Sequence, residues 1–169
     1  MVSYYVKRGY IFFCLDQTTF SLKPYVTRGW FLRGSRPVVE FNWTRKRFHA
    51  YGVINGEKEH YRFYDEINWR TVMDFLRYLH RRYPKLLILW DGAPWHKEHH
   101  VKAFLKRHDI KTLKFPPYSP EENPTEQVWK TTKHAAANTY FPDEETYRRE
   151  IRRILHQKIL TKMFKYLTH

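Results

Sequence analysis

Three acidic residues, Asp16, Asp91 and Glu126, stand where carboxylates from different elements could meet. Asp16 follows the apolar run Tyr10–Leu15, and Asp91 follows the apolar run Leu86–Trp90. Both runs are typical of buried strands. Because ligands of open α/β sheets bind beyond the carboxyl ends of the strands, we expect the two aspartates to converge there. Three ionised carboxylates in one place repel one another unless a hard divalent cation lies between them.

Carboxylates that hold two Mg²⁺ or Mn²⁺ ions about 4 Å apart form the usual site for in-line phosphoryl transfer. One ion activates the attacking hydroxyl, and the other stabilises the leaving oxygen. The sequence therefore predicts that Asp16, Asp91 and Glu126 are catalytic acids at a divalent-metal site. Each acid also has a purely structural interpretation. The two aspartates could be polar strand ends, and Asp91 with Gly92 could form a turn. Glu126 lies three residues after Asn123, which is the spacing of a capping box.

Histidines cluster after the second acid, at His96, His99 and His100. A zinc site is one interpretation, but the His-Glu-x-x-His arrangement and the cysteine partners that support such sites are missing. We favour His96, five residues after Asp91, as a residue that positions this acid or contacts phosphate. The one cysteine, Cys14, lies within an apolar run and is typical of a small core residue rather than a nucleophile.

The chain is strongly basic, with 31 Lys and Arg against 17 Asp and Glu and a formal charge of +14. A net charge of about 2–8 is usually enough for the solubility of a small domain. The excess, with Tyr and Trp interleaved among the basic residues, favours contact with a nucleic acid, although a basic solvated surface is the alternative.

A single cysteine excludes a disulfide framework. Since no apolar run reaches the roughly 18–20 residues of a membrane span, we expect a cytoplasmic protein that does not bind membranes.

The elements that position these residues can be assigned from local patterns. The runs Arg47–Ile54 and Glu57–Tyr64 flank Asn55-Gly56, which predicts a hairpin whose two central turn residues both have positive φ. Residues 37–43 could start the second strand early. The further expected elements are a helix from Asn68 to about Tyr83, a strand at Leu86–Trp90, a short helix around Val101, Phe104 and Leu105, a strand at Ile110–Phe115, a rigid loop at Pro116–Pro124, a helix from Asn123, a basic helix from Pro142 to about Gln157 and a helical tail from Lys158. This order predicts one α/β domain with a mixed sheet.

The segments CLDQTTFSL, TRGWFLRGSRPVV, LILWDGAPWHK and FPPYSPEENPTEQVWKTTK resemble the catalytic domain of mariner-like transposases. More narrowly, they resemble its prokaryotic insertion-sequence branch, the DDE superendonucleases. Between Asp91 and Glu126 lie 34 residues, the spacing that this superfamily uses between its second and third acids. The resemblance implies a ribonuclease-H-like fold, shared with retroviral integrases, in which a mixed five-stranded sheet is flanked by helices. It also implies that Asp16, Asp91 and Glu126 hold two Mg²⁺ ions, and that the protein cuts DNA at terminal inverted repeats and joins the 3′ ends to a TA target.

Two residues depart from this family's pattern. Gln17 stands where members usually carry an acid, and Glu122 stands where they favour an aliphatic residue. Only 15 residues precede Asp16, so we expect the upstream helix-turn-helix recognition region to be absent. Residues 1–169 would then form one catalytic domain, with a core at about 9–140 and basic helices at about 142–169. The chain would then be an isolated catalytic domain, one half of an element that encodes its DNA-recognition half separately, or a truncated remnant. The expected partners are DNA, a second copy in a synaptic homodimer and, in the second of these cases, the separately encoded DNA-recognition half.

The resemblance and the basic residues together predict six DNA contacts. Lys130 and Lys133 follow Glu126 by four and seven positions, so they share its helix face. The loop after the first strand should rim the site, although its tryptophan could instead anchor the core. The expected DNA contacts are Arg28, Trp30, Arg33, His96, Lys130 and Lys133. Two other functions remain open at this stage: a stand-alone nuclease of the same fold, and a non-catalytic nucleic-acid binder derived from a transposase.

Overall fold

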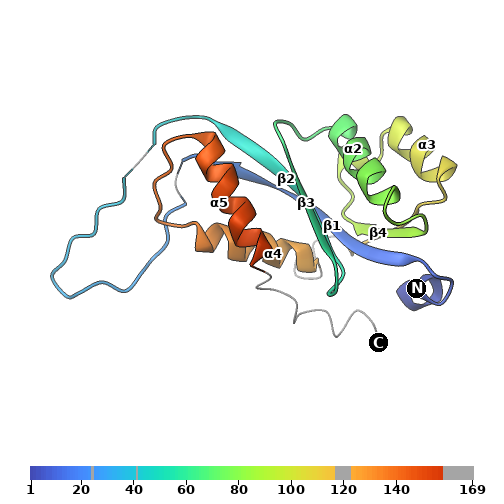
Figure 1. The fold of residues 1–169 in the computed structure, drawn as a ribbon, viewed down its shortest axis with the longest axis horizontal. Helices are drawn as coiled ribbons and strands as arrows, with labels where there is room; N and C mark the ends of the chain where they lie inside the picture. Colours follow the sequence, from blue (N-terminus) through green and yellow to red (C-terminus); the bar gives the residue numbers. More distant parts are fainter. Residues whose placement is uncertain (24, 41, 117–122, 158–169) are drawn as a thin grey trace.

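The computed structural model describes residues 1–23, 25–40, 42–116 and 123–157 (Figure 1). Most of the loop expected at 116–124, including Glu122, and the helical tail expected from residue 158 lie outside the described residues. The chain forms a five-stranded sheet with the strand order β3-β2-β1-β4-β5. The strands are β1 (Ile11–Ser21), β2 (Arg47–Ile54), β3 (Glu59–Tyr64), β4 (Leu86–Trp90) and β5 (Lys111–Lys114). The first three strands pair antiparallel, while β1–β4 and β4–β5 pair parallel, so the predicted mixed sheet is confirmed.

The helices cover both faces of this sheet. They are α1 (Val2–Val6), α2 (Trp69–His80), the 3₁₀ turn η1 (Pro94–His96), α3 (His99–Arg107), α4 (Pro124–Ala135) and α5 (Glu144–His156). One core contains residues of α4 and α5 together with Phe12, Cys14 and Phe20 of β1. The other contains residues of α2 and α3 together with Phe13 and Leu15. Successive side chains of β1 thus enter opposite cores, as the pleat of a strand requires.

Local signals fix the helix starts as the sequence predicts. Asn68 caps α2 by accepting hydrogen bonds from the amides of Arg70 and Thr71, and the Thr71 hydroxyl completes a capping box. Asn123 and Asp143 cap α4 and α5 with their side chains. The short helix α1 was not expected from the sequence, and none of its residues is buried.

Three expectations for the first half of the chain are wrong. β1 does not end at Asp16 but continues to Ser21, because residues 14–21 pair antiparallel with β2. Residues 37–43, apart from the undescribed position 41, form no strand. In the hairpin turn only Gly56 has a positive φ, at 91°. Asn55 instead closes the turn with its side chain, whose Oδ1 accepts hydrogen bonds from the amides of Glu57 and Lys58.

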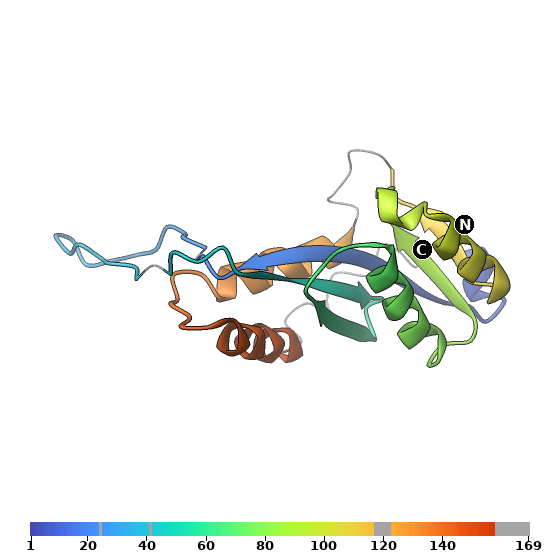
Figure 2. The ribbon, with the colours of Figure 1, turned by 90° about the horizontal axis from the view of Figure 1, so that it is seen from above.

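Residues 22–46 form an arm that projects beyond the end of the sheet between β1 and β2 (Figures 1 and 2). Its two ends are tied to the segment between α4 and α5. Asn138 donates its backbone N–H to the Tyr25 carbonyl and exchanges side-chain hydrogen bonds with the Thr27 backbone. Asn42 donates its side-chain amide to the carbonyls of Phe141 and Pro142. The root of the arm is therefore anchored, while its far part extends away from the sheet.

Candidate active site

The parallel ladder brings two of the predicted acids to the same level. Its last pair is Cys14 with Leu89, and Asp16 and Asp91 each lie two residues further on. Asp91 follows β4 directly, whereas Asp16 lies within β1, opposite Gly52 of β2. The neighbouring strands β1 and β4 thus deliver one carboxylate each to the carboxyl end of the parallel part of the sheet.

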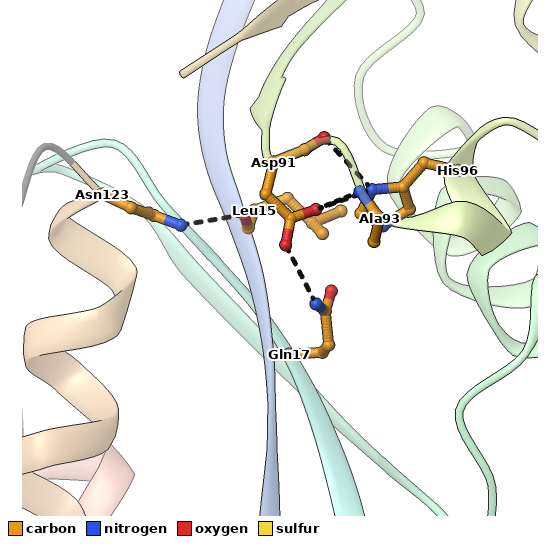
Figure 3. A network of polar contacts seen from close by, with 6 residues as sticks. All are labelled: Leu15, Gln17, Asp91, Ala93, His96 and Asn123. Carbon is orange, nitrogen blue, oxygen red and sulfur yellow. Dashed lines mark hydrogen bonds and ion pairs between the residues drawn. The ribbon is translucent and has the colours of Figure 1, made fainter. Parts of the chain in front are cut away.

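The carboxylate of Asp91 is held by three groups (Figure 3). Its Oδ1 accepts the Ala93 amide at 3.0 Å and lies 3.0 Å from Nδ1 of His96. Its Oδ2 accepts the Gln17 side-chain amide at 3.5 Å. The hydrogen bond with His96 holds the pKa of Asp91 below its usual value, although partial burial works in the opposite direction. The bond from the Ala93 amide closes a turn at Asp91 and Gly92, which is the structural role that the sequence allows for this acid. Asp91 therefore also stabilises the loop in which it lies.

His96 is fixed beside Asp91 by its own packing. The side chain is buried, and its ring stacks on Trp90 at a centroid distance of 4.2 Å and an angle of 7°. With Nδ1 directed at Asp91, the ring orients this carboxylate. His96 is only 5% exposed, so this conformation favours the positioning role over direct contact with DNA. His99 stacks on His100 and His100 stacks on Trp69, away from this pair.

Asp16 occupies a different environment from Asp91. Burial raises its pKa to about 7, and the charges of the Asp91 and Glu126 carboxylates are smaller contributions in the same direction. The backbone N–H of Gln17 and the indole N–H of Trp129 act in the opposite direction. Asp16 is thus a partly buried carboxyl group that lies near two other acids, and Lys133 is a cation that interacts with its charge.

The first turn of α4 is bonded to β1 immediately before Asp16. The Thr125 hydroxyl donates to the Cys14 carbonyl at 2.6 Å. The Asn123 side-chain amide donates to the Leu15 carbonyl at 3.3 Å (Figure 3). Asn123 Oδ1 also accepts the Thr125 amide as the N-cap. Glu126 follows in the same turn and is exposed. In the described part of the chain, its carboxylate makes no capping-box bond to Asn123, which contradicts that structural alternative.

Asp16 and Glu126 line one open cavity of about 530 Å³. Lys130 and Lys133, two of the predicted DNA contacts, line the same cavity, as does Tyr25 at the root of the arm. Burial lowers the pKa of Lys133, while the charges of Asp16 and Glu126 raise it. Asp91 is not among the residues that line this cavity, whereas Gln17, which donates to its carboxylate, is one of them.

The arm residues lie further from the acids than the sequence predicts. Only its root reaches the cavity, while residues 28–33 lie out along the projecting arm (Figure 2). Trp30 is fully exposed at 103%, so the interpretation of this residue as a core anchor is wrong. Arg28 and Arg33 are exposed as well. These three residues do not rim the cavity of Asp16 and Glu126; they form a separate basic and aromatic surface.

Residues 12–148 match the family model of the DDE superfamily endonucleases. The chain belongs to this family. Solved structures of similar fold include the Mos1 transposase paired-end complex with the left transposon end, with a TM-score of 0.72 and 17% identity over 97% of this chain and 54% of that one. The Mos1 transposase catalytic domain with raltegravir and Mn has a TM-score of 0.67 and 16% identity over 97% of this chain and 80% of that one. The catalytic core domain of BIV integrase has a TM-score of 0.54 and 18% identity over 85% of this chain and 80% of that one.

These likenesses confirm the ribonuclease-H-like, integrase-like fold of this DDE superfamily endonuclease domain. The chain spans about half the length of the Mos1 transposase chains in the paired-end and pre-cleavage complexes. No curated protein matches it in sequence. Among the helices of the described residues, none combines the length and the apolar composition that a membrane span requires.

The DDE superfamily endonuclease domain offers carboxylate oxygens, which are the ligands that Mg²⁺ and Mn²⁺ prefer. Burial and the charges of the two other carboxylates raise the pKa of Asp16, and a divalent cation would relieve this repulsion, so the donor chemistry of Asp16, Asp91 and Glu126 fits such a cation. Within the described residues, no group of three or more His, Cys, Asp or Glu side chains is arranged to hold a metal ion. This finding applies to the histidine cluster and to the three predicted acids alike, and the Asp91 carboxylate is paired with His96 instead.

Sequence reasoning missed several residues that shape the site. Thr125 and the side-chain amide of Asn123 connect α4 to β1, and Gln17 donates to Asp91. The position of Gln17 beside Asp91 also gives its departure from the family pattern a physical meaning, because an amide N–H attracts the carboxylate that an acid would repel. Only the capping role of Asn123 was readable from the local sequence.

Proposed function

We propose that this chain is the catalytic domain of a DNA transposase, which uses divalent metal ions to cleave DNA at the ends of a mobile element and to join those ends to a TA target. The observation that carries the proposal is the register of the sheet. It sets Asp16 and Asp91 at one level on adjacent strands, and the bonds of Asn123 and Thr125 to β1 bring the first turn of α4, with Glu126, to the same place.

In this proposal Asp16, Asp91 and Glu126 hold two Mg²⁺ ions, for which Mn²⁺ can substitute. When bound, the ions activate the attacking hydroxyl and stabilise the leaving oxygen. His96 and Gln17 orient the Asp91 carboxylate from opposite sides. Lys130 and Lys133 line the cavity of Asp16 and Glu126, where they can hold the phosphates next to the reacting one.

DNA as the substrate is supported by the charge of +14 and by the exposed arm. Arg28, Trp30 and Arg33 would contact DNA away from the acids, where cations hold phosphates and an aromatic ring stacks on bases. The similar Mos1 structures include a paired-end complex with Mg, one with Mn and a strand transfer complex. By analogy we infer transposon-end and target DNA as substrates and a homodimer in the synaptic complex.

The narrower assignments follow from the sequence resemblance. We assign the chain to the prokaryotic insertion-sequence branch and place it in the cytoplasm, at the nucleoid, because its substrate would be there. We treat residues 1–169 as one catalytic domain, with a core at about 9–140.

The test is a joining assay with defined probes. The protein is incubated with a short duplex that has free 3′-hydroxyl ends and a supercoiled plasmid, in Mg²⁺ or Mn²⁺. We expect joined products with junctions at TA, which are lost in EDTA and in Asp91→Asn. Nicked plasmid without joining would identify a stand-alone nuclease instead, and no product in either metal would identify a non-catalytic DNA binder.

A further inference from the structure

Trp129 lies at the junction of α4 and the sheet, three residues after Glu126 and therefore on nearly the same helix face. Its ring is buried and packs edge-on against Phe20 and Tyr61, at centroid distances of 6.2 and 5.7 Å. The indole nitrogen Nε1 is buried as well, and it has no hydrogen-bond partner among the described residues. Trp129 lines the same cavity as Asp16 and Glu126, and its indole N–H lowers the pKa of Asp16.

Gly52 leaves the space that this indole occupies. It is the partner of Asp16 in the β1–β2 ladder. A Cβ atom at this position would lie 2.6 Å from Cζ2 and 2.7 Å from Cη2 of Trp129, and 2.9 Å from Cδ1 of Tyr61. The φ of Gly52 is not positive, so the need for glycine comes from this close approach rather than from the backbone conformation.

We propose that Trp129, seated on Gly52, is a positioning residue for Asp16. Its indole N–H directs one oxygen of the Asp16 carboxylate, which would leave the other oxygen available to a divalent cation. The inference rests on the proposed function, because it assigns work within the same site. Carboxylates that bind metals are commonly held by such neighbouring donors, and loss of one typically weakens metal binding by about 10–100-fold.

Trp129 also connects the two acids mechanically. The same side chain anchors α4, which carries Glu126, and lies against Gly52, the partner of Asp16 in the β1–β2 ladder. Substitutions at Trp129 and at Gly52 should therefore both disturb the site, but each in its own way. Trp129→Phe removes the N–H but keeps an aromatic ring in the core, whereas Gly52→Ala keeps the N–H but displaces the indole.

The first measurement is calorimetric titration with MnCl₂. We expect Trp129→Phe and Gly52→Ala each to weaken Mn²⁺ binding by about tenfold. Gly52→Ala should cost less further affinity in the Trp129→Phe background than in the wild type, because phenylalanine lacks the two indole atoms that the Cβ would strike and only the close approach to Tyr61 remains. Val128→Ala is the control for packing on the same helix, and Trp69→Phe is the control for loss of an indole elsewhere. Both controls should bind Mn²⁺ like the wild type.

The second measurement needs no metal, and Trp129→Phe serves in it only to assign one signal. The chain has six tryptophans, so its ¹H–¹⁵N spectrum has few indole signals, and Trp129→Phe assigns the one of interest. We expect this signal to move in Asp16→Asn and to stay in place in Trp69→Phe. An unmoved signal, together with unchanged Mn²⁺ affinity in Trp129→Phe, would overturn the inference. A wild-type chain that binds no Mn²⁺ would instead overturn the proposed function, while the spectrum would still decide the contact between Trp129 and Asp16.

Discussion

Asp16 and Asp91 extend from adjacent parallel strands at the same level, yet their carboxyl groups have opposite electrostatic environments. The pKa of Asp16 is raised to about 7 by burial, and the pKa of Asp91 is lowered by His96. Near neutral pH one of the two acids is therefore ionised, while the other is close to its midpoint. A cation that bound both would remove this difference, because it would favour the ionised form of Asp16.

Asp16 should make the metal-free protein less stable as the pH rises. The folded state holds this proton more tightly than the unfolded chain, so the group's contribution to the free energy of unfolding falls between pH 4 and about 7. At pH 8 in EDTA, we expect Asp16→Asn to be more stable than the wild type by a few kcal/mol, at about 1.4 kcal/mol per pKa unit. Urea unfolding at pH 5 and pH 8 measures the difference, which should shrink at the lower pH.

Mg²⁺ supplies the complementary test of the same group. At pH 8 the wild type should gain about 2.7 kcal/mol of unfolding free energy at 100 times the dissociation constant. Asp16→Asn should gain much less. Equal stabilisation of the two proteins by Mg²⁺ would show that Asp16 is not a ligand of the metal.

Asp91→Asn should abolish DNA cleavage and leave the fold and the DNA affinity nearly unchanged. A metal ion contributes several kcal/mol of transition-state stabilisation, so we expect a loss of about 10³-fold or more in rate. Circular dichroism and a filter-binding assay check the fold and the affinity. Glu57→Gln, an exposed carboxylate-to-amide change in the hairpin turn, is the matched control and should cleave normally. Cleavage by Asp91→Asn at the wild-type rate would exclude a catalytic role for this acid.

Lys130 and Lys133 should contribute to the salt dependence of DNA binding. Each phosphate contact adds about 0.9 to the slope of log K against log salt, so the double Lys→Gln variant should reduce that slope by about 2. The matched control carries Lys102→Gln and Lys106→Gln on α3, on the other face of the sheet, and should keep the slope. Fluorescence anisotropy, measured from about 50 to about 300 mM salt on duplexes of two unrelated sequences, distinguishes the variants. Affinity that depended strongly on duplex sequence would contradict binding through phosphate contacts and would show that these residues themselves recognise a DNA sequence.

Trp30→Ala should weaken DNA binding without affecting stability. The side chain is fully exposed, so its removal leaves no cavity, and the melting temperature should stay within experimental error of the wild type. Stacking on a base is worth about 1–3 kcal/mol, which corresponds to roughly a fivefold to 150-fold loss of affinity. Leu32→Ala, a similarly exposed change on the same arm, should have a smaller effect because it has no aromatic face. A lower melting temperature for Trp30→Ala would show that the ring packs against the protein.

The sequence predicted those parts of the fold that depend on neighbours along the chain. Asn68 and Asn123 are readable as caps, and the run Leu86–Trp90 is readable as a buried strand. The length of β1 was not readable, because its second half is a strand only through pairing with β2. The contact between Gly52 and Trp129 joins residues that are far apart in the sequence, and no local pattern announces it.

The same distinction applies to the candidate site. The three acids stand out by type and spacing, whereas the direction of the Asp91 side chain depends on His96, Ala93 and Gln17 together. The arm was expected beside the acids because it follows β1 directly. The extension of β1 to Ser21 carries the start of the arm further along the sheet, and only its root remains at the cavity.

The anchored arm allows the covalent link between β1 and β2 to be broken without loss of the sheet. β1 is held by β2 on one side and β4 on the other, and hydrogen bonds from Asn138 and Asn42 secure the two ends of the arm. A single proteolytic nick in the exposed segment 28–33 would therefore yield two fragments that stay associated. The domain is a natural candidate for fragment complementation, in which a short piece that contains β1 and Asp16 is expressed separately from the piece that supplies Asp91 and Glu126.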